Sequence, residues 1–298
     1  MKKIMKKSAI FIGVVIVILL IWGLFEPYQV DVEEETAPID NLPDKWEGKE
    51  IAVMGDFQVG MWMDNASNLS DVVDTLIKRD PEAVLLLGDY VYHSTDNHQE
   101  EMDKVAEYLR PLTETDIPVF AVKGNHDYGM SSKKKEPNME TAQRVDETLQ
   151  ELGVEMLHNK SVPLQLNDNS KSPLYLTGIG ANWPDEAEVA TAFQQVPDSA
   201  PRFVFMHNPE TFNNIPEEKA PVSTAGHSHG GQIRIPFTPH WSWKDLLPSD
   251  EAHVDGWVTD SYGSDGNELY VNRGIGLSIV PIRINNPPEI TVFQLKAE

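Results

Sequence analysis

The chain has 298 residues, of which 40% are hydrophobic, enough for one large domain or two small ones with a substantial core. It contains no cysteine, which excludes disulfide bonds and thiolate metal ligands. The formal net charge is -23 at pH 7, and such a surface repels nucleic acid at long range, so we expect no nucleic-acid partner.

The N-terminal segment has the composition of a membrane anchor. Residues 8–25 carry no charge and as a helix would span about 27 Å, close to the thickness of a hydrocarbon core. Lysines crowd residues 1–7 and acidic residues follow from Glu26, so the positive-inside rule predicts a cytoplasmic N-terminus and an extracytoplasmic remainder. A cleaved signal peptide and a buried core helix are the alternatives, but residues 22–27 contain no small-x-small cleavage pattern. We therefore predict a single-pass protein of the cell membrane whose anchor is uncleaved.

Residues 26–48 are rich in Pro and Glu, which predicts a tether between the membrane and a folded domain at residues 49–298. In the first half of that domain, apolar positions with a helical period predict a helix from residue 67 or 68 to 79, and further helices near 99–110 and 139–152. The second half is richer in predicted strands, at 162–166, 174–178, 202–207, 232–235, 268–272 and 290–295. Residues 236–262 form a long aromatic loop with Trp241, Trp243 and Trp257, and loops of that length are often functional.

Polar motifs follow several short apolar runs that predict buried strands. The motifs are residues 55–58, 88–89, 124–127 and 226–229, with His207 alone before the last. Their polar side chains are Asp56, Gln58, Asp89, Asn125, His126, His207, His227 and His229. Because ligand sites in α/β sheets lie at the carboxyl ends of strands, we expect these groups to gather at one sheet edge. Oxygen and imidazole donors together suit Mn, Fe or Zn rather than Ca.

These motifs resemble those of the calcineurin-like metallophosphoesterase family. The resemblance covers nearly everything from residue 50 and is closest to a membrane-associated bacterial branch, through residues 226–232, 269–276, 281–283 and 287–291. It implies an α/β fold of four layers, in which two mixed β-sheets pack face to face with helices outside. It also implies hydrolysis of phosphomonoesters or phosphodiesters. Some members of that branch act on phospholipids or on a nucleotide-linked lipid precursor, so either is a candidate substrate.

The resemblance also implies a ligand set for two divalent metal ions. One ion would be held by Asp56, Gln58, Asp89 and His229. The other would be held by Asp89, Asn125, His207 and His227, with Asp89 bridging the two ions. A hydroxide between the ions would attack phosphorus in line with the leaving group. His126 would protonate the leaving oxygen as general acid, and Asp127 is a candidate to orient His126.

Gln58 departs from the commonest family pattern, in which the first motif is Asp-x-His. A neutral amide oxygen is a weaker donor than imidazole for Zn or Fe, so manganese is favoured, with Fe and Zn as alternatives. Tyr92 is similar in position to an iron-binding tyrosine of purple acid phosphatases, but their first motif differs, so we expect packing or substrate contact there.

The sequence therefore predicts a membrane-anchored dinuclear-metal phosphohydrolase that cleaves a phosphodiester or phosphoanhydride, with a lipid-linked substrate favoured. Trp62 and the tryptophans of the aromatic loop would form an apolar rim to the metal cleft, and residues 133–135 form a lysine run that could attract an anionic headgroup. Two alternatives stay open. One is a tethered nucleotide phosphodiesterase, and the other is a non-catalytic scaffold whose first metal site is degenerate because of Gln58.

Overall fold

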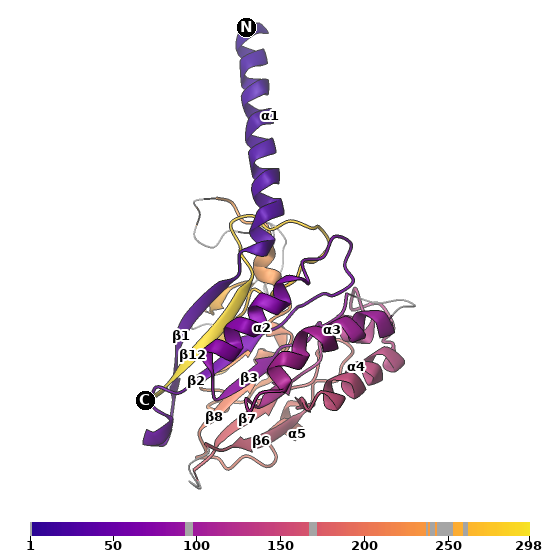
Figure 1. Cartoon of the computed structure of the whole chain (residues 1–298). Coiled ribbons are helices and arrows are strands. Elements are labelled where there is room, and N and C mark those ends of the chain that lie inside the picture. The colour runs from indigo at the N-terminus through magenta and orange to yellow at the C-terminus, as the bar shows by residue number, and fades with distance from the viewer. Residues whose placement is uncertain are drawn as a thin grey trace.

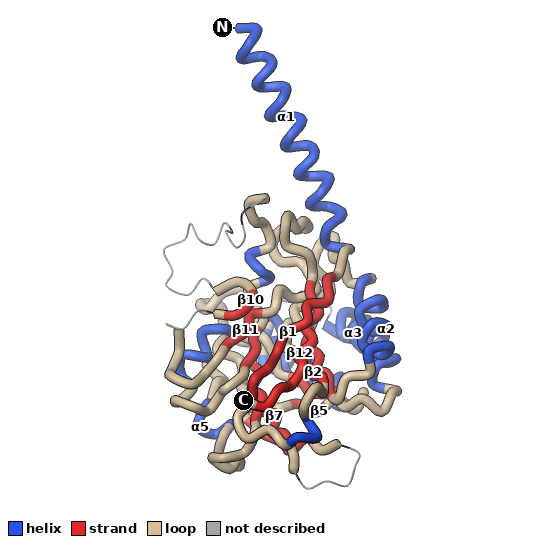
Figure 2. The backbone as a smooth tube through the Cα atoms, turned by 90° about the vertical axis from the view of Figure 1, so that its left-hand side faces the viewer, coloured by secondary structure: helices blue, strands red, loops and turns tan. Residues whose placement is uncertain are grey.

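The computed structural model describes residues 2–92, 98–166, 172–236, 238, 242, 253–258 and 262–298 (Figure 1). One long helix stands apart from an α/β body built on two sheets (Figure 2). Within the described residues, the α-helices are α1 (Lys2–Phe25), α2 (Asn68–Arg79), α3 (His98–Thr113), α4 (Met139–Glu151) and α5 (Val189–Ala192). The strands are β1 (Asp31–Ile39), β2 (Glu50–Met54), β3 (Ala83–Leu86), β4 (Val119–Ala121), β5 (Glu155–Met156), β6 (Lys160–Leu164), β7 (Leu174–Gly178), β8 (Arg202–Phe205), β9 (Ser223–Ala225), β10 (Gly256–Trp257), β11 (Leu269–Val271) and β12 (Glu289–Ala297).

Each sheet has a parallel centre and is mixed overall. The first has the order β1-β12-β2-β3-β4-β5, with β2 to β5 parallel, β12 antiparallel to β2, and β1 parallel to β12. The second has the order β10-β11-β9-β8-β7-β6, with β7, β8, β9 and β11 parallel and an antiparallel strand at each edge. The parallel strands of one sheet end at one edge, and this feature positions the site described below.

The two sheets pack face to face through a single apolar cluster. Val53 and Leu85 of the first sheet share this cluster with Leu176 and Phe205 of the second, and all four side chains are fully buried. Because side chains alternate along a strand, neighbouring residues face the opposite side of each sheet.

Helices and short 3-10 turns cover the outer faces. The first sheet packs its outer residues, such as Leu86, against Leu76 of α2, Leu109 of α3 and Leu149 of α4. The second sheet is covered more thinly, by α5 and the 3-10 helix η4 (Pro209–Asn214), through a cluster that includes Phe212. The predicted four-layer fold with two mixed sheets and flanking helices is confirmed.

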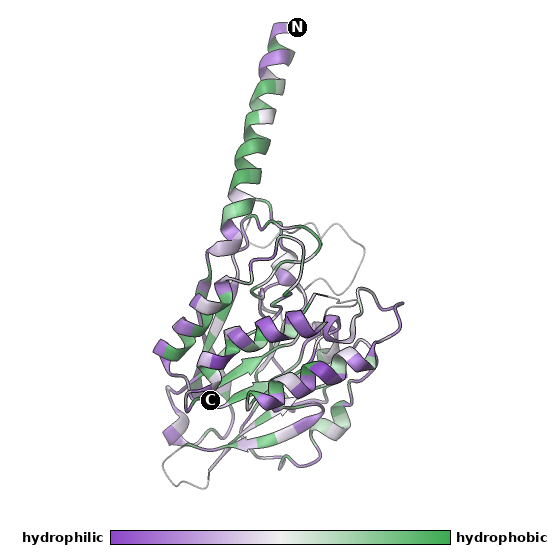
Figure 3. Ribbon diagram, turned by 45° about the vertical axis from the view of Figure 1, so that its right-hand side comes forward, coloured by the Kyte–Doolittle hydropathy of each residue, from purple (hydrophilic) through white to green (hydrophobic). Residues whose placement is uncertain are grey.

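Helix α1 projects from one end of the body, and its apolar side chains are exposed along most of its length (Figure 3). Its 24 residues correspond to about 36 Å, and by length and composition it is a candidate membrane span. Within the described part of the chain, its last turns touch the body, where the backbone N–H of Arg283 donates a 3.0 Å hydrogen bond to the carbonyl oxygen of Gly23.

The prediction of a tether at residues 26–48 is wrong. Strand β1 lies within it and pairs along its whole length with β12, at the other end of the chain. The acidic side chains that suggested a solvated linker have partners: Glu33 pairs with Arg273, Glu34 pairs with Arg79, and Glu35 accepts a hydrogen bond from Trp257. The folded body therefore begins near residue 26 rather than at residue 49.

The predicted helices match α2, α3 and α4, and all but one of the predicted strands match β6, β7, β8, β11 and β12 within a few residues. The strand expected at 232–235 is wrong. Ile233 and Arg234 form only isolated bridges, since the chain turns at Gln232, whose φ is 55°. Trp241, Trp243 and His240 of the aromatic loop lie outside the described residues.

Candidate metal centre

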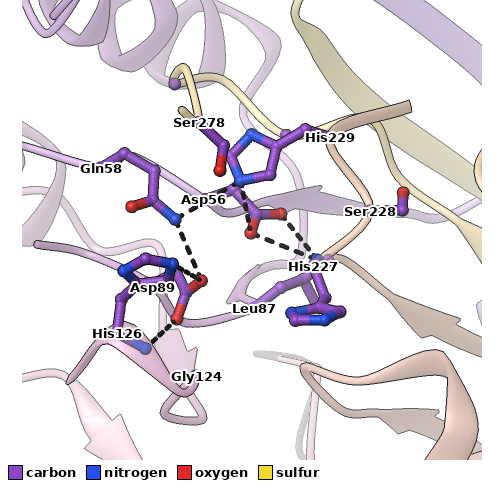
Figure 4. A network of polar contacts seen from close by, with 12 residues as sticks. Asp56, Gln58, Leu87, Asp89, Gly124, His126, His227, Ser228, His229 and Ser278 are labelled. Carbon is purple, nitrogen blue, oxygen red and sulfur yellow. Dashed lines mark hydrogen bonds and ion pairs between the residues drawn. The ribbon is translucent and has the colours of Figure 1, made fainter. Parts of the chain in front are cut away.

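The carboxyl ends of five parallel strands meet at one edge, and the predicted ligands follow these strands. Asp56 and Gln58 follow β2, Asp89 follows β3 and Asn125 follows β4, all in the first sheet. His207 follows β8, and His227 and His229 follow β9, in the second sheet. The site thus straddles the junction of the two sheets, and Figure 4 shows Asp56, Gln58, Asp89, His126, His227 and His229 around one centre.

Asp89 lies at the middle of this centre. Its Oδ2 accepts a 3.0 Å hydrogen bond from Gln58 Nε2 and lies 3.3 Å from His207 Nε2. Its Oδ1 accepts the backbone N–H of His126 at 2.8 Å. One donor atom each from Asp89, His207 and His227 lies within 4.8 Å of the others, a spacing that suits a shared metal ion.

Three donors beside Asp89 turn toward one another. His207 Nε2 lies 3.2 Å from Asn125 Oδ1 and 3.2 Å from His227 Nδ1. The other ring nitrogen of His207 faces the carbonyl oxygen of Leu87 at 2.9 Å, which fixes the ring orientation as in many metal-binding histidines. The Asn125 amide donates to the carbonyl oxygen of Met130 at 2.8 Å, which leaves its Oδ1 aimed into the site.

On the other side of Asp89, His229 Nε2 lies 3.6 Å from Asp56 Oδ1 and 3.4 Å from Gln58 Nε2. The Asp56 carboxylate also accepts the backbone N–H of His227 at 3.0 Å. Gln58 is fully buried, and its Oε1 has no hydrogen-bond partner among the described residues. A 180° turn of this amide would exchange Oε1 with Nε2, and a cation between Asp89 and His229 would then satisfy the buried oxygen. The residues present therefore fit a second metal ion.

The backbone of the site is strained. Five of the predicted ligands have left-handed φ values of 50° to 69°, namely Asp56, Gln58, Asp89, His227 and His229. Non-glycine residues in this region cost roughly 1–3 kcal/mol each, and such strain gathers at functional sites. Gly124 permits the crowding, because a Cβ there would lie 2.2 Å from Asp89 Oδ1 and 2.6 Å from His207 Cε1.

Asp127 does not orient His126, so that prediction is wrong. Its carboxylate accepts the backbone N–H groups of Asp89 and Gly124 at 2.8 Å and of Tyr90 at 2.9 Å. His126 and Asp127 begin a 3-10 turn, in which consecutive side chains point in different directions. Asp127 instead holds two ligand loops together.

Burial and charge oppose each other at the centre. Burial raises the pKa of Asp56 to about 7, against the pull of His207. Burial also favours a high pKa for Asp89, but His207 and His126 outweigh it and hold that pKa below the usual value. Burial lowers the pKa of His207, but the Asp89 carboxylate outweighs this effect and raises that pKa to about 9. Positive charge at the centre is thus favourable, and a divalent cation would supply it.

His126 lies at the rim of a cavity of about 200 Å³ that adjoins Asp89 and Asn125. Its ring stacks on Tyr92, with centroids 5.3 Å apart, and its Nε2 lies 4.0 Å from Asp89 Oδ2. Tyr92 is therefore a packing partner of His126, as expected, while also lining the cavity.

Sequence patterns missed several residues of the cavity. Trp183 meets His227 edge to face with centroids 5.1 Å apart, and Ser131, Ser278 and Ile279 complete the wall. None of these lies in a polar motif after a strand, so no local signal marked them. Arg273 forms ion pairs with Glu33 and Glu289.

Two mixed sheets that bring carboxylate, amide and imidazole groups to one edge define a metal-dependent phosphoesterase fold. A family model for the calcineurin-like phosphoesterases matches residues 49–237. The chain belongs to this family.

Three relatives illustrate its range. Phosphodiesterase YaeI of Escherichia coli is 29% identical over 77% of this chain and 76% of its own. The uncharacterized metallophosphoesterase YkuE of Bacillus subtilis is 24% identical over 91% of this chain and 87% of its own. UDP-2,3-diacylglucosamine pyrophosphatase LpxG of Chlamydia trachomatis is 27% identical over 47% of this chain and 41% of its own. The family implies an enzyme that uses divalent metal ions to hydrolyse phosphate esters.

Proposed function

We propose that the protein is a membrane-anchored hydrolase that uses two divalent ions, manganese in preference to Fe or Zn, to cleave a phosphodiester or phosphoanhydride bond in a lipid-linked substrate. The observation that carries the proposal is the position of Asp89. This buried carboxylate lies between Gln58 on one side and His207 on the other, beside an open cavity.

The contacts support the division of ligands that the family pattern implies. Asp56, Gln58 and His229 lie together on one side of Asp89. Asn125, His207 and His227 lie together on the other side. When bound, the two ions would supply an activated water and would neutralise the phosphate oxygens.

The chain's own groups complete the chemistry. His126 lines the cavity beside Asp89, which accepts its backbone N–H, and this position supports a role for its ring as the donor of a proton to the leaving oxygen. The stack on Tyr92 restricts the ring and keeps it at the cavity rim. Trp183 packs edge to face against His227 and restricts that ring as well.

A second cavity of about 480 Å³ lies beyond Trp183 and is lined by Lys133, Lys134 and Lys135. Glu136 and Asp185 also line this cavity, so its lysines leave a small excess of positive charge in a chain with a net charge of -23. It supports a substrate with an anionic or polar headgroup next to the scissile phosphate.

Helix α1 supports a substrate in or near the membrane. By the positive-inside rule, the lysines in the first turns of α1 favour a cytoplasmic N-terminus and an extracytoplasmic catalytic body. The similarity to LpxG, whose name describes a nucleotide-linked diacyl lipid, favours the same class of substrate.

The test uses the full chain in lipid nanodiscs, with metal content measured by mass spectrometry and hydrolysis of bis-p-nitrophenyl phosphate measured with added Mn. We expect close to two ions per chain. His126→Ala should retain both ions and lower kcat by about 10²–10⁴-fold for a diester with an alkoxide leaving group, the substrate used for this comparison because p-nitrophenolate leaves readily without a proton. His158→Ala is the matched control, because His158 is partly exposed and pairs with Glu186 away from the centre.

Unchanged turnover in His126→Ala would contradict the role of His126 as general acid. One ion or none per chain, together with no turnover after addition of Mn, would contradict the proposal that the protein is an enzyme. It would favour a non-catalytic scaffold whose first metal site is degenerate at Gln58.

A further inference from the structure

An apolar groove adjoins the metal centre. A cavity of about 320 Å³ shares His227, His229, Ser278 and Ile279 with the wall of the metal-site cavity. Away from the metals, the wall continues through Ile233 and Val280. This second cavity, defined by residues 227–233 and 278–280, is called the groove below.

Two polar side chains of the groove wall, those of Gln232 and Ser228, bond within the protein. The Gln232 amide donates to the carbonyl oxygen of Val280 at 2.6 Å, and its oxygen accepts the backbone N–H of Ser278 at 2.7 Å. The Ser228 hydroxyl donates to the carbonyl oxygen of Val254 at 2.7 Å and points away from the metal-site residues in Figure 4. The groove therefore presents mainly methyl and methylene groups to a ligand, although Ser278 and the candidate metal ligands His227 and His229 line its inner end.

The groove opens at the foot of the membrane helix. Ile279 and Val280 at its mouth are 66% and 37% exposed. The same loop continues to residues 282–284, which pack closely against α1. A Cβ added at Gly23 of α1 would lie 3.1 Å from side-chain atoms of Ile282 and Ile284. Ile284 also donates its backbone N–H to the carbonyl oxygen of Gln232. Figure 1 shows this yellow segment passing the foot of α1.

We infer that the groove binds an acyl chain of the substrate, with the phosphate of the same molecule at the metal centre. This inference rests on the proposed function and deepens it. The occupant follows from three observations: the groove is apolar, its inner end lies at the metal ligands His227 and His229, and its mouth faces the end of α1 where a bilayer surface would lie. A free hydrophilic ester would leave this surface uncovered, whereas an acyl chain that leaves the membrane would cover it.

The experiment compares methyl and octyl p-nitrophenyl phosphate as substrates of the full chain in nanodiscs, with empty nanodiscs to correct for partition into lipid. Each methylene buried in the groove should raise kcat/KM about fourfold. Three buried methylenes would therefore make kcat/KM for the octyl ester about 60 times that for the methyl ester. The double variant Ile233→Ser, Val280→Ser should lower this ratio at least tenfold. Ile235→Ser is the matched control: Ile235 is exposed at the same end of the body but does not line the groove.

Binding of octylphosphonate and methylphosphonate, measured by calorimetry, reports on the groove without turnover. If octylphosphonate binds more tightly than methylphosphonate, and the double variant abolishes this difference, the groove is supported. This holds even if no ester is cleaved, and in that case only the proposed function fails. The methyl ester could be cleaved while neither kcat/KM nor phosphonate binding depends on chain length. That result would overturn the acyl-chain groove and leave the proposed function standing. Equal loss of the ratio in Ile235→Ser would also overturn it, because the effect would then belong to the whole exposed end.

Discussion

The side chain of Asn286 donates a 2.7 Å hydrogen bond to the carbonyl oxygen of the metal-site residue His229. The backbone N–H of Asn286 is in turn held by the carboxylate of Glu26, the first residue after α1. Glu26 also accepts the backbone N–H of Asn285 at 2.8 Å. The end of α1 is therefore connected by hydrogen bonds, through Glu26, to the loop that supports the candidate metal centre.

This connection predicts where the chain can be truncated. A fragment that begins at residue 26 keeps Glu26 and β1, whereas one that begins at residue 45 loses both and exposes the edge of β12. The loss of buried Ile39 alone should cost about 2–5 kcal/mol, a large share of the roughly 5–15 kcal/mol that stabilises a domain. We expect cooperative thermal unfolding by circular dichroism for the longer fragment only. Equal melting temperatures for the two fragments would show that β1 is dispensable.

The ligand motifs could be predicted from the sequence because each is local. A polar residue such as Asp89 or His207 directly follows a buried apolar strand, and parallel strands bring their ends together without further information. The metal centre is thus encoded in short segments whose positions the sheet topology determines.

Strand β1 could not be predicted in this way. It is an edge strand in which only Ala37 and Ile39 are buried, and its partner β12 lies at the far end of the chain. Its charges resemble those of a linker until partners such as Arg273 and Trp257 are placed beside them. The groove was likewise hidden, since it depends on contact between residues 227–233 and 278–280.

Gln58 should control occupancy of one metal site and its metal preference. We expect Gln58→Ala to weaken the binding of one of the two ions by more than about tenfold. Even residues that only orient metal ligands change metal affinity by about 10–100-fold. Gln58→His should favour Zn over Mn, because imidazole is the better donor for Zn. Metal content after dialysis against each ion measures both effects. If Gln58→Ala retains two tightly bound ions, the amide is not a ligand.

Asp127 should act on metal affinity through the backbone. Asp127→Ala leaves the backbone N–H groups of Asp89, Tyr90 and Gly124 without their acceptor. Each of these buried groups that stays unsatisfied should cost about 1–3 kcal/mol of folding stability. We expect lower stability in urea and weaker binding of both ions, because Asp89 contacts residues on both sides of the centre. Asp74→Asn, on the exposed face of α2, is the control for loss of a carboxylate. A stability change with intact metal binding would restrict Asp127 to a structural role.

Glu289 should make the stability of the fold fall as pH rises. It is fully buried, and burial raises its pKa above the ordinary value of 4.5, although Arg273 at 3.1 Å opposes the shift. The folded chain therefore holds this proton more tightly than the unfolded chain, so the stabilisation is complete below about pH 4.5 and is lost as pH rises through the folded pKa. Glu289→Gln cannot ionise, so the stability of the wild type relative to this variant should decrease in urea titrations as pH rises above about 4.5. Glu147→Gln, on the exposed face of α4, should show no such trend. If the stability of the wild type relative to Glu289→Gln instead increases with pH, the ion pair with Arg273 outweighs the effect of burial on the pKa of Glu289.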